Sequence, residues 1–212
     1  PTLDPVSLLA AIGSVTRNIG LVATVSTTYN AVDALAARFA TLDRITGGRS
    51  GWNIVTTAHP ATAPNFGDAT FPEKAQRYAR AAEFVAEACA LWDHAATPLP
   101  QHRPVLVQAG QSGDGRTFAA RTAEAIFCPA PTIEAGIEFR SDMRRRIAEE
   151  GRDPDGVRIM PGLSFILADS EAEAIAKDEA LLALADEALC IEYLSESLAC
   201  DLTGFDPGSP IP

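Results

Sequence analysis

Small polar side chains collect at the ends of two apolar runs in the first part of the chain. The runs extend over residues 19–25 and 52–57. The polar residues at their ends are Thr24, Ser26, Thr27 and Thr28 in the first case, and Asn53, Thr56 and Thr57 in the second. If the runs are parallel strands, their carboxyl ends meet at the edge of the sheet where ligands bind. These hydroxyl and amide groups are therefore candidate ligand contacts. Threonine is also common in strands and asparagine in turns, so spacing alone leaves both interpretations open.

A third stretch, residues 109–115 with the sequence AGQSGDG, has the composition of an anion-binding turn. It follows a strand predicted at Val105 to Gln108 and leads into a short helix predicted from Thr117 to Thr122. Free backbone N–H groups at the start of a helix, together with the positive end of the helix dipole, suit a phosphate group. Many turns of this composition bind nothing, so the pattern by itself is a weak indication.

The segment between the first two runs has the pattern of a helix. Its apolar positions at helical spacing are Val32, Leu35, Phe39 and Leu42. Asn30 is predicted as the N-cap, and Gly47 with Gly48 is predicted to end the helix. Neither flanking run alternates cleanly between polar and apolar residues, which favours strands covered on both faces. The sequence therefore predicts a parallel strand–helix–strand unit with a right-handed crossover.

The rest of the chain continues this alternation. Further helices are predicted at residues 4–16, 73–93 and 132–150 and after Ser170, and further strands at 125–128 and 157–167. The predicted inward positions are Leu8, Leu9 and Ile12; then Ala81, Phe84, Val85, Ala88, Leu91 and Trp92; and then Ile133, Ile137, Met143 and Ile147. We expect residues 59–71 to form a long loop that lines one side of the ligand site, and the tail from Leu202 to Pro212 to be irregular.

Charged residues suggest local contacts within these helices. Glu73 and Arg77 are predicted to form an i,i+4 ion pair, and the arginines at 144–146 are expected on a solvated face. Ser170 with Glu173 three residues later has the capping-box pattern.

Several short motifs together resemble one protein family. They are ATVSTTYN followed by GGRSGWNIVTT, NFG at 65–67, RYARAAEF at 77–84, RPVLVQAGQS at 103–112 and MPGLS at 160–164. In this order they resemble the bacterial-luciferase-like flavin monooxygenases. The most similar branch contains nitrilotriacetate monooxygenase component A and the dibenzothiophene-sulfone and long-chain alkane monooxygenases.

The resemblance implies an α/β fold of the eightfold (β/α) TIM-barrel type. Such a barrel needs about 250 residues, and this chain has 212. We therefore expect one partial barrel domain over residues 1–212, containing about strands three to seven. Family members carry more residues between the helix at 73–93 and the strand at 105–108, so residues 94–104 are interpreted as a shortened or missing connection.

The resemblance also implies a function. Members of this family use reduced FMN, which a separate NAD(P)H:flavin reductase supplies, to insert one atom of O2 into a small organic substrate. The residues that match the family's cofactor-binding positions are Thr24, Asn53, Thr57, Tyr78, Gly110 and Ser112. Thr24, Asn53 and Thr57 would lie beside the isoalloxazine ring or its tail. Tyr78, Gly110 and Ser112 would surround the ribityl phosphate.

One family position differs in this chain. Members commonly have a histidine four residues before the matching tyrosine, and here that position is Lys74. Lysine can offer a cation to a phosphate, but it does not shuttle protons near neutrality unless its pKa is strongly lowered. The family's acidic flavin contact on the second strand has no counterpart in these residues. The catalytic residues thus stay unassigned.

Composition limits the classes of partner. There are 28 acidic and 17 basic residues, which argues against a nucleic acid partner. No apolar run is long enough to cross a bilayer. Cys89, Cys128, Cys190 and Cys200 lack metal-ligand spacing, so we expect buried free thiols, no metal site and a cytoplasmic protein.

Three functional classes stay open at this point. The first is the FMN-dependent monooxygenase, with a homodimer expected from the resemblance alone. The second is an inactive barrel remnant that acts as a structural or interaction subunit. The third is a relative that uses a deazaflavin. The sequence does not identify the substrate.

Overall fold

A computed structural model describes residues 3–67, 70–198 and 200–204. The chain divides into two compact units, Pro1–Leu163 and Ser164–Pro212. The assignment of all 212 residues to one barrel domain stays a prediction. Part of the expected irregular tail, residues 205–212, lies outside the described residues.

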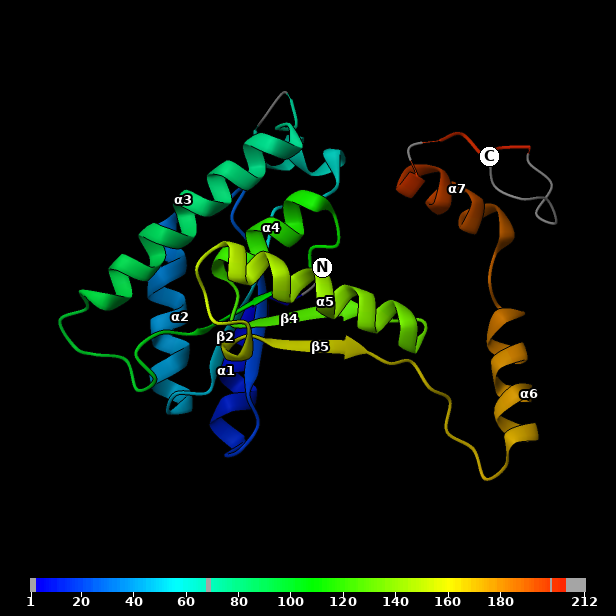
Figure 1. Ribbon diagram of the computed structural model, residues 1–212, viewed down its shortest axis with the longest axis horizontal. Coiled ribbons are helices and arrows are strands. Elements are labelled where there is room, and N and C mark those ends of the chain that lie inside the picture. Colours follow the sequence, from blue (N-terminus) through cyan, green and yellow to red (C-terminus); the bar gives the residue numbers. More distant parts are fainter. Residues whose placement is uncertain (1–2, 68–69, 199, 205–212) are drawn as a thin grey trace. The chain divides into compact units, whose positions relative to one another are not determined.

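Strands and helices alternate regularly through the first unit (Figure 1). Its elements are α1 (Pro5–Val15), β1 (Leu21–Ser26), α2 (Val32–Thr46), β2 (Ser50–Val55), η1 (Pro60–Phe66), α3 (Lys74–Asp93), β3 (Val105–Gln108), α4 (Gly113–Thr122), β4 (Ala125–Pro129), α5 (Ile133–Glu149), η2 (Pro154–Gly156) and β5 (Arg158–Gly162). The second unit contains α6 (Glu171–Leu182) and α7 (Glu187–Leu198), the latter not predicted from sequence.

The five strands form one parallel sheet in the order β1-β2-β3-β4-β5. Each strand pairs with the next one along the chain, and a helix lies in every connection. Such sequential parallel pairing is the arrangement of a (β/α) barrel. The predicted α/β barrel type, incomplete in this chain, is therefore confirmed.

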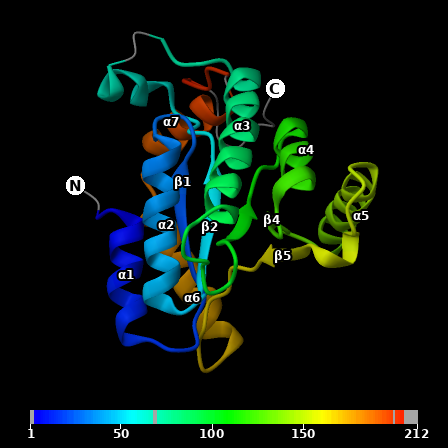
Figure 2. The ribbon, with the colours of Figure 1, turned by 90° about the vertical axis from the view of Figure 1, so that its left-hand side faces the viewer.

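One face of the sheet is covered by helices and forms the core. In β1, Leu21, Ala23 and Val25 are buried, whereas Val22 between them is exposed. Trp52 is fully buried among Phe39, Phe84 and Trp92, and its indole Nε1 donates to the carbonyl of Val25 at 2.9 Å. Figure 2 shows α1, α2 and α3 side by side, and α2 and α3 contribute to this aromatic cluster. Trp52 is therefore a core residue of this unit.

The opposite face of the sheet is open in the described residues. Its exposed apolar side chains are Val22, Val105, Phe127 and Met160. Thr24 and Asn53 lie on the same face, paired in register. In a closed barrel this face lines the interior, so the candidate polar residues project toward the barrel axis.

Helix boundaries confirm some predicted capping residues and correct others. Gly47 ends α2 in the left-handed conformation, with φ +65°. The N-cap of α2 is Ala31, so the prediction for Asn30 is wrong. The Asn30 amide instead donates to the Ser26 carbonyl at 2.8 Å and accepts from Arg38 at 2.9 Å. At the start of α6, Ser170 caps the Glu173 N–H, but Glu173 bonds the N–H of Asp169, so only half of the predicted capping box is present.

Several predicted inward residues are exposed because they lie at the margins of the buried stripes of their helices. Leu8 and Leu91 are each 43% exposed. In α5, Met143 and Ile147 are buried as predicted, but the buried partner nearer the start of the helix is Phe139. Ile133 and Ile137 instead line an apolar groove of about 640 Å³ beside β5.

Four further predictions need correction. The fifth strand covers Arg158–Gly162 only, shorter than predicted, and α4 begins at Gly113, earlier than predicted. Within the arginine run, Arg146 is largely covered, with 27% of its side chain exposed, because it binds Asp142. Of the cysteines, all four are free, but Cys190 and Cys200 are exposed, so burial was predicted correctly only for Cys128 and in part for Cys89.

The connection at residues 94–104 is held to the amino end of the sheet by a buried carboxylate. Asp43 is fully buried at the end of α2. Its oxygens accept from the Ser50 hydroxyl at 2.7 Å and from the side-chain amide of Gln101 at 2.5 Å. Leu99 is buried as well, and Arg44 donates to the Thr97 carbonyl at 2.7 Å. Residues 94–104 thus pack against this unit as an ordered connection. His94 and His102, near the two ends of this connection, are exposed.

Asp43→Ala should destabilise the protein by about 2–3 kcal/mol, since it leaves the buried Ser50 hydroxyl without its acceptor and removes one of the acceptors of the Gln101 amide. Urea unfolding measures the effect. Asp33→Ala, at an exposed position in the first turn of the same helix, is the control and should cost less than about 1 kcal/mol. Equal losses for the two variants would contradict this role of Asp43.

A partly buried acidic residue links α4 and α5. Asp142 accepts from Arg116 at 3.1 Å, Arg145 at 2.6 Å and Arg146 at 3.0 Å. Burial alone raises the pKa of this carboxyl, but the hydrogen bonds from the three arginines outweigh burial and lower the pKa below its usual value.

A lowered carboxyl pKa stabilises the fold above the unfolded-state value of about 3.9, and this contribution is lost as the pH falls through the folded-state pKa. Asp142→Asn should therefore lower the free energy of unfolding at pH 7, and the difference from wild type should shrink below about pH 4. Glu149→Gln, at an exposed partner of Arg145, should show little effect at any pH. Urea unfolding between pH 7 and 3 tests this, and a pH-independent difference for Asp142→Asn would refute it.

Candidate functional site

Two of the predicted cofactor contacts touch each other on the open face of the sheet. Thr24 and Asn53 are register partners, and the Asn53 amide nitrogen donates to the Thr24 hydroxyl at 3.0 Å. The Asn53 carbonyl oxygen, Oδ1, is buried and accepts no hydrogen bond. A buried acceptor without a donor costs free energy. This pair therefore presents a polar group that a bound ligand with an N–H or O–H donor would satisfy.

Thr57, just beyond β2, lies near the end of β1. Its hydroxyl and that of Ser26 are 2.6 Å apart. Its φ of +52° is in the left-handed region, which β-branched residues rarely adopt. The Thr57 carbonyl accepts a hydrogen bond from Arg77 of α3. The carboxyl ends of β1 and β2 are thus joined to α3 at this residue.

Tyr78, Gly110 and Ser112 come together around the start of α4. A Cβ atom at Gly115 would lie 2.9 Å from both the Tyr78 hydroxyl and the Gly110 Cα, and a Cβ at Gly110 would lie 2.8 Å from the Gly115 Cα. The Ser112 hydroxyl accepts from the Gly115 N–H at 3.2 Å as the N-cap of α4. Only glycine allows this approach, which places the tyrosine hydroxyl against the turn.

The same turn offers backbone donors to an anion. Gly113 and Asp114 are the first residues of α4 and are exposed. N–H groups at these positions have no partner within a helix. Together with the positive end of the helix dipole and the Tyr78 hydroxyl, they form a cradle of donors whose chemistry suits a phosphate.

Gln108 joins the turn to the sheet. The side chain is buried at the end of β3, and its amide donates to the Ile54 carbonyl of β2 at 3.0 Å. The oxygen of the same amide, Oε1, accepts a hydrogen bond from the Gly110 N–H. This amide therefore fixes the turn relative to the strand that carries Asn53.

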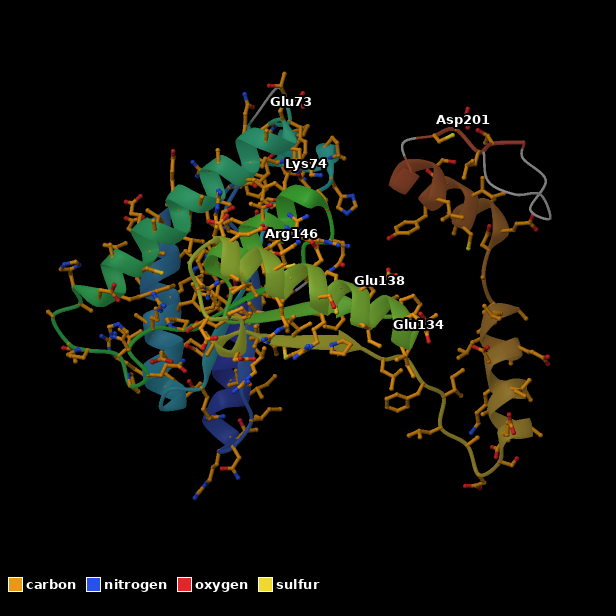
Figure 3. All side chains as sticks on the ribbon, in the orientation of Figure 1. Glu73, Lys74, Glu134, Glu138, Arg146 and Asp201 are labelled. Carbon is orange, nitrogen blue, oxygen red and sulfur yellow. The ribbon has the colours of Figure 1, made fainter. Side chains whose placement is uncertain are left out.

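Lys74 lies at the first position of α3, where Figure 3 labels it. Its ammonium is 3.5 Å from the carboxylate of Asp114, and half of its side chain is exposed. The cation is thus beside the start of α4, but an acidic neighbour partly neutralises it. Among the described residues, no three His, Cys, Asp or Glu side chains are grouped as metal ligands.

Sequence reasoning missed the arginines that support this site. The expected ion pair between Glu73 and Arg77 is wrong, because the Arg77 guanidinium turns to the strand ends and lies 4.4 Å over the ring of Phe71. Arg77 falls within the RYARAAEF motif, so the motif was a usable signal. Tyr29 stacks on Phe66 with ring centroids 4.2 Å apart, and its buried hydroxyl has no hydrogen-bond partner among the described residues.

No helix among the described residues is both long and apolar enough to span a membrane.

Comparison with known proteins gives consistent relationships. The chain is 38% identical to nitrilotriacetate monooxygenase component A of Aminobacter aminovorans, over 99% of this chain and 55% of that protein. It is 33% identical to dibenzothiophene-sulfone monooxygenase of Rhodococcus erythropolis, over 99% of this chain and 54% of that protein. A solved structure of riboflavin lyase with modified FMN and riboflavin superposes with a TM-score of 0.87 at 28% identity, over 99% of this chain and 55% of that one.

The chain spans about half the length of the curated relatives it matches. The two sequence alignments extend over 248 and 246 positions, more than the 212 residues of the chain, so the relatives carry additional residues inside the matched region. Placing that difference at residues 94–104 stays a prediction.

Residues 1–197 match the sequence model of one family, which is described as luciferase-like monooxygenase. This match covers most of the chain and agrees with the branch that the motifs indicated. The chain therefore belongs to the luciferase-like monooxygenase family.

Proposed function

We propose that this protein binds reduced FMN and uses it with O2 to oxygenate a small organic substrate. The observation that carries the proposal is the cradle at the start of α4, where the Tyr78 hydroxyl approaches the Gly110–Gly115 contact and the N–H groups of the first turn are exposed. Membership in the luciferase-like family, whose members are flavin-dependent monooxygenases, and the FMN in the structure of riboflavin lyase support it.

The residues fit the phosphate end of FMN in chemistry as well as in space. A phosphate carries about two negative charges and only accepts hydrogen bonds near neutral pH. The cradle supplies donors: the N–H groups of Gly113 and Asp114, the Tyr78 hydroxyl, and the Lys74 ammonium nearby. Ser112 keeps the first turn in place through its cap to Gly115.

The ring end of FMN fits the pair on the open sheet face. The reduced isoalloxazine carries ring N–H donors, and one of them would satisfy the unpaired Oδ1 of Asn53. Thr24 orients the asparagine by accepting from its amide nitrogen, so Oδ1 rather than the amide nitrogen is presented. Thr57 would contact the chain between ring and phosphate.

When bound, reduced FMN supplies the oxygen activation, since no side chain of a protein reacts with O2 in this way. The protein's part is to bind and orient the flavin and to keep water from the reacting region. Lys74 replaces the family's histidine and, being half-exposed and paired with Asp114, serves as a cation rather than a proton carrier.

We further propose that a separate NAD(P)H:flavin reductase delivers the reduced flavin, as the family resemblance implies. The related nitrilotriacetate enzyme is called component A, which agrees with a system of more than one protein. A homodimer is proposed on the same basis, and a cytoplasmic location is proposed from the scattered free cysteines.

Ser112→Ala and Tyr78→Phe should each weaken FMN binding about tenfold, because each removes or displaces a donor to the phosphate. Quenching of flavin fluorescence during titration, with oxidised and then photoreduced FMN, measures the affinity. Thr132→Ala is the matched control for Ser112→Ala, because Thr132 caps α5 in the same way away from the cradle. Thr132→Ala should leave the affinity unchanged.

Absence of FMN binding by folded wild-type protein would refute the proposal and leave the remnant interpretation. Saturable binding of a deazaflavin but not of FMN would instead select that cofactor.

Lys74→Met should weaken FMN binding only about threefold at low salt, because Lys74 is half-exposed and already paired with Asp114. The difference should disappear in about 0.5 M salt, where charge interactions are screened. Lys177→Met, which removes a comparably exposed lysine from the second unit, should have no effect at either salt concentration. A salt-independent loss of affinity for Lys74→Met would contradict a purely electrostatic role.

A further inference from the structure

Thr57 is held in a conformation that its side chain disfavours. A φ of +52° is a strained backbone conformation for a β-branched residue. Such strain persists only where the surroundings enforce it. Within the described residues, the contacts that do so are the Ser26 hydroxyl, 2.6 Å from the Thr57 hydroxyl, and the guanidinium of Arg77.

Arg77 extends from α3 to the carboxyl end of β2. Its Nη1 donates to the carbonyl of Thr57 and is 3.5 Å from that of Thr56. The ring of Phe71 lies 4.4 Å from its guanidinium carbon. The remaining donor, Nε, is buried and has no partner. Because a buried unpartnered donor costs stability, packing alone does not account for an arginine here.

Arg80 makes a comparable connection one turn later, but to the other strand. Its Nε donates to the Thr27 carbonyl at 3.0 Å and its Nη2 to the Asn30 carbonyl at 3.3 Å. Helix α3 therefore holds the end of β1 through Arg80 and the end of β2 through Arg77. Of the two arginines, Arg77 is the one that binds the strained residue.

We propose that Arg77 is a positioning residue for the flavin. Its guanidinium keeps Thr57 in the left-handed conformation, and this fixes how Thr57 and the end of β2 meet the cofactor. Arg77 acts through the Thr57 backbone and need not touch the flavin itself. The inference rests on the proposed function, since it assigns a role at the same site.

The first test compares Arg77→Gln with Arg80→Gln, which lose the same charge from the same helix. Arg77→Gln should weaken FMN binding about tenfold, the loss expected for a charge-assisted hydrogen bond, and Arg80→Gln by less than about threefold. Hydrogen exchange of the cofactor-free protein gives a second readout. Backbone amides at 56–58 should exchange faster in Arg77→Gln, while those of the α3 core keep wild-type rates.

The second test asks whether Arg77 acts through the strain at Thr57. Glycine adopts positive φ at no steric cost. In a Thr57→Gly background, therefore, Arg77→Gln should reduce the FMN affinity by less than about threefold, although Thr57→Gly itself weakens binding. Arg77→Lys should retain most of the affinity, because one ammonium can make the bonds that Nη1 makes. It also serves as the informative variant if Arg77→Gln does not fold.

Equal losses for Arg77→Gln and Arg80→Gln would overturn the inference. So would an undiminished loss in the Thr57→Gly background, or an Arg77→Lys variant that binds as weakly as Arg77→Gln. If the wild-type protein binds FMN and Arg77→Gln binds it with the same affinity, this inference is overturned but the proposed function is not. Failure of the folded wild-type protein to bind FMN would overturn the proposed function, and this inference with it.

Discussion

The side-chain amide of Gln108 is the interaction on which the candidate site depends. It spans two elements by donating to the Ile54 carbonyl of β2 and accepting from the Gly110 N–H of the turn. A buried amide with both ends satisfied is rigid, because any displacement leaves a polar group unpaired in a low-dielectric interior. The position of the phosphate cradle relative to Asn53 is therefore set by one residue of β3. The helix-covered core around Trp52 holds the strands themselves in place.

The two ends of the sheet differ in how well their polar groups are satisfied. At the amino end, Asp43 bonds every donor that approaches it, and the connection at 94–104 is held in place. At the carboxyl end, Asn53 and Arg77 have buried polar atoms without partners, and Thr57 is strained. Local rules are broken where a protein binds ligands and kept where it needs only stability. In barrels the carboxyl end of the strands is the functional end.

Much of the first unit could be predicted from sequence because its patterns are local. The limits of β3, the glycine that ends α2 and the buried stripe of α3 follow from periodicity and capping, which involve neighbours along the chain. The candidate residues were found by motif, and the structure brings Tyr78, Gly110 and Ser112 together.

Long-range partners were not predictable in this way. Asn30 has the composition of an N-cap, yet the Ser26 carbonyl and Arg38 compete for its amide. Arg77 has the acidic residue Glu73 one turn away, yet it binds the carbonyl of Thr57 beyond β2. A buried carbonyl gains more from a charged donor than an exposed carboxylate does. The exposed Ile133 and Ile137 follow helical periodicity but line a groove that no neighbouring helix of this unit fills.

The central claim is that the start of α4 holds the flavin through its phosphate. The most direct measurement is a parallel titration of the wild-type protein with FMN and with riboflavin, which differ only in that group. The account predicts that FMN binds at least about a hundredfold more tightly, the value of two charge-assisted hydrogen bonds. Equal affinity for the two flavins would contradict the phosphate cradle, whatever else binds the ring.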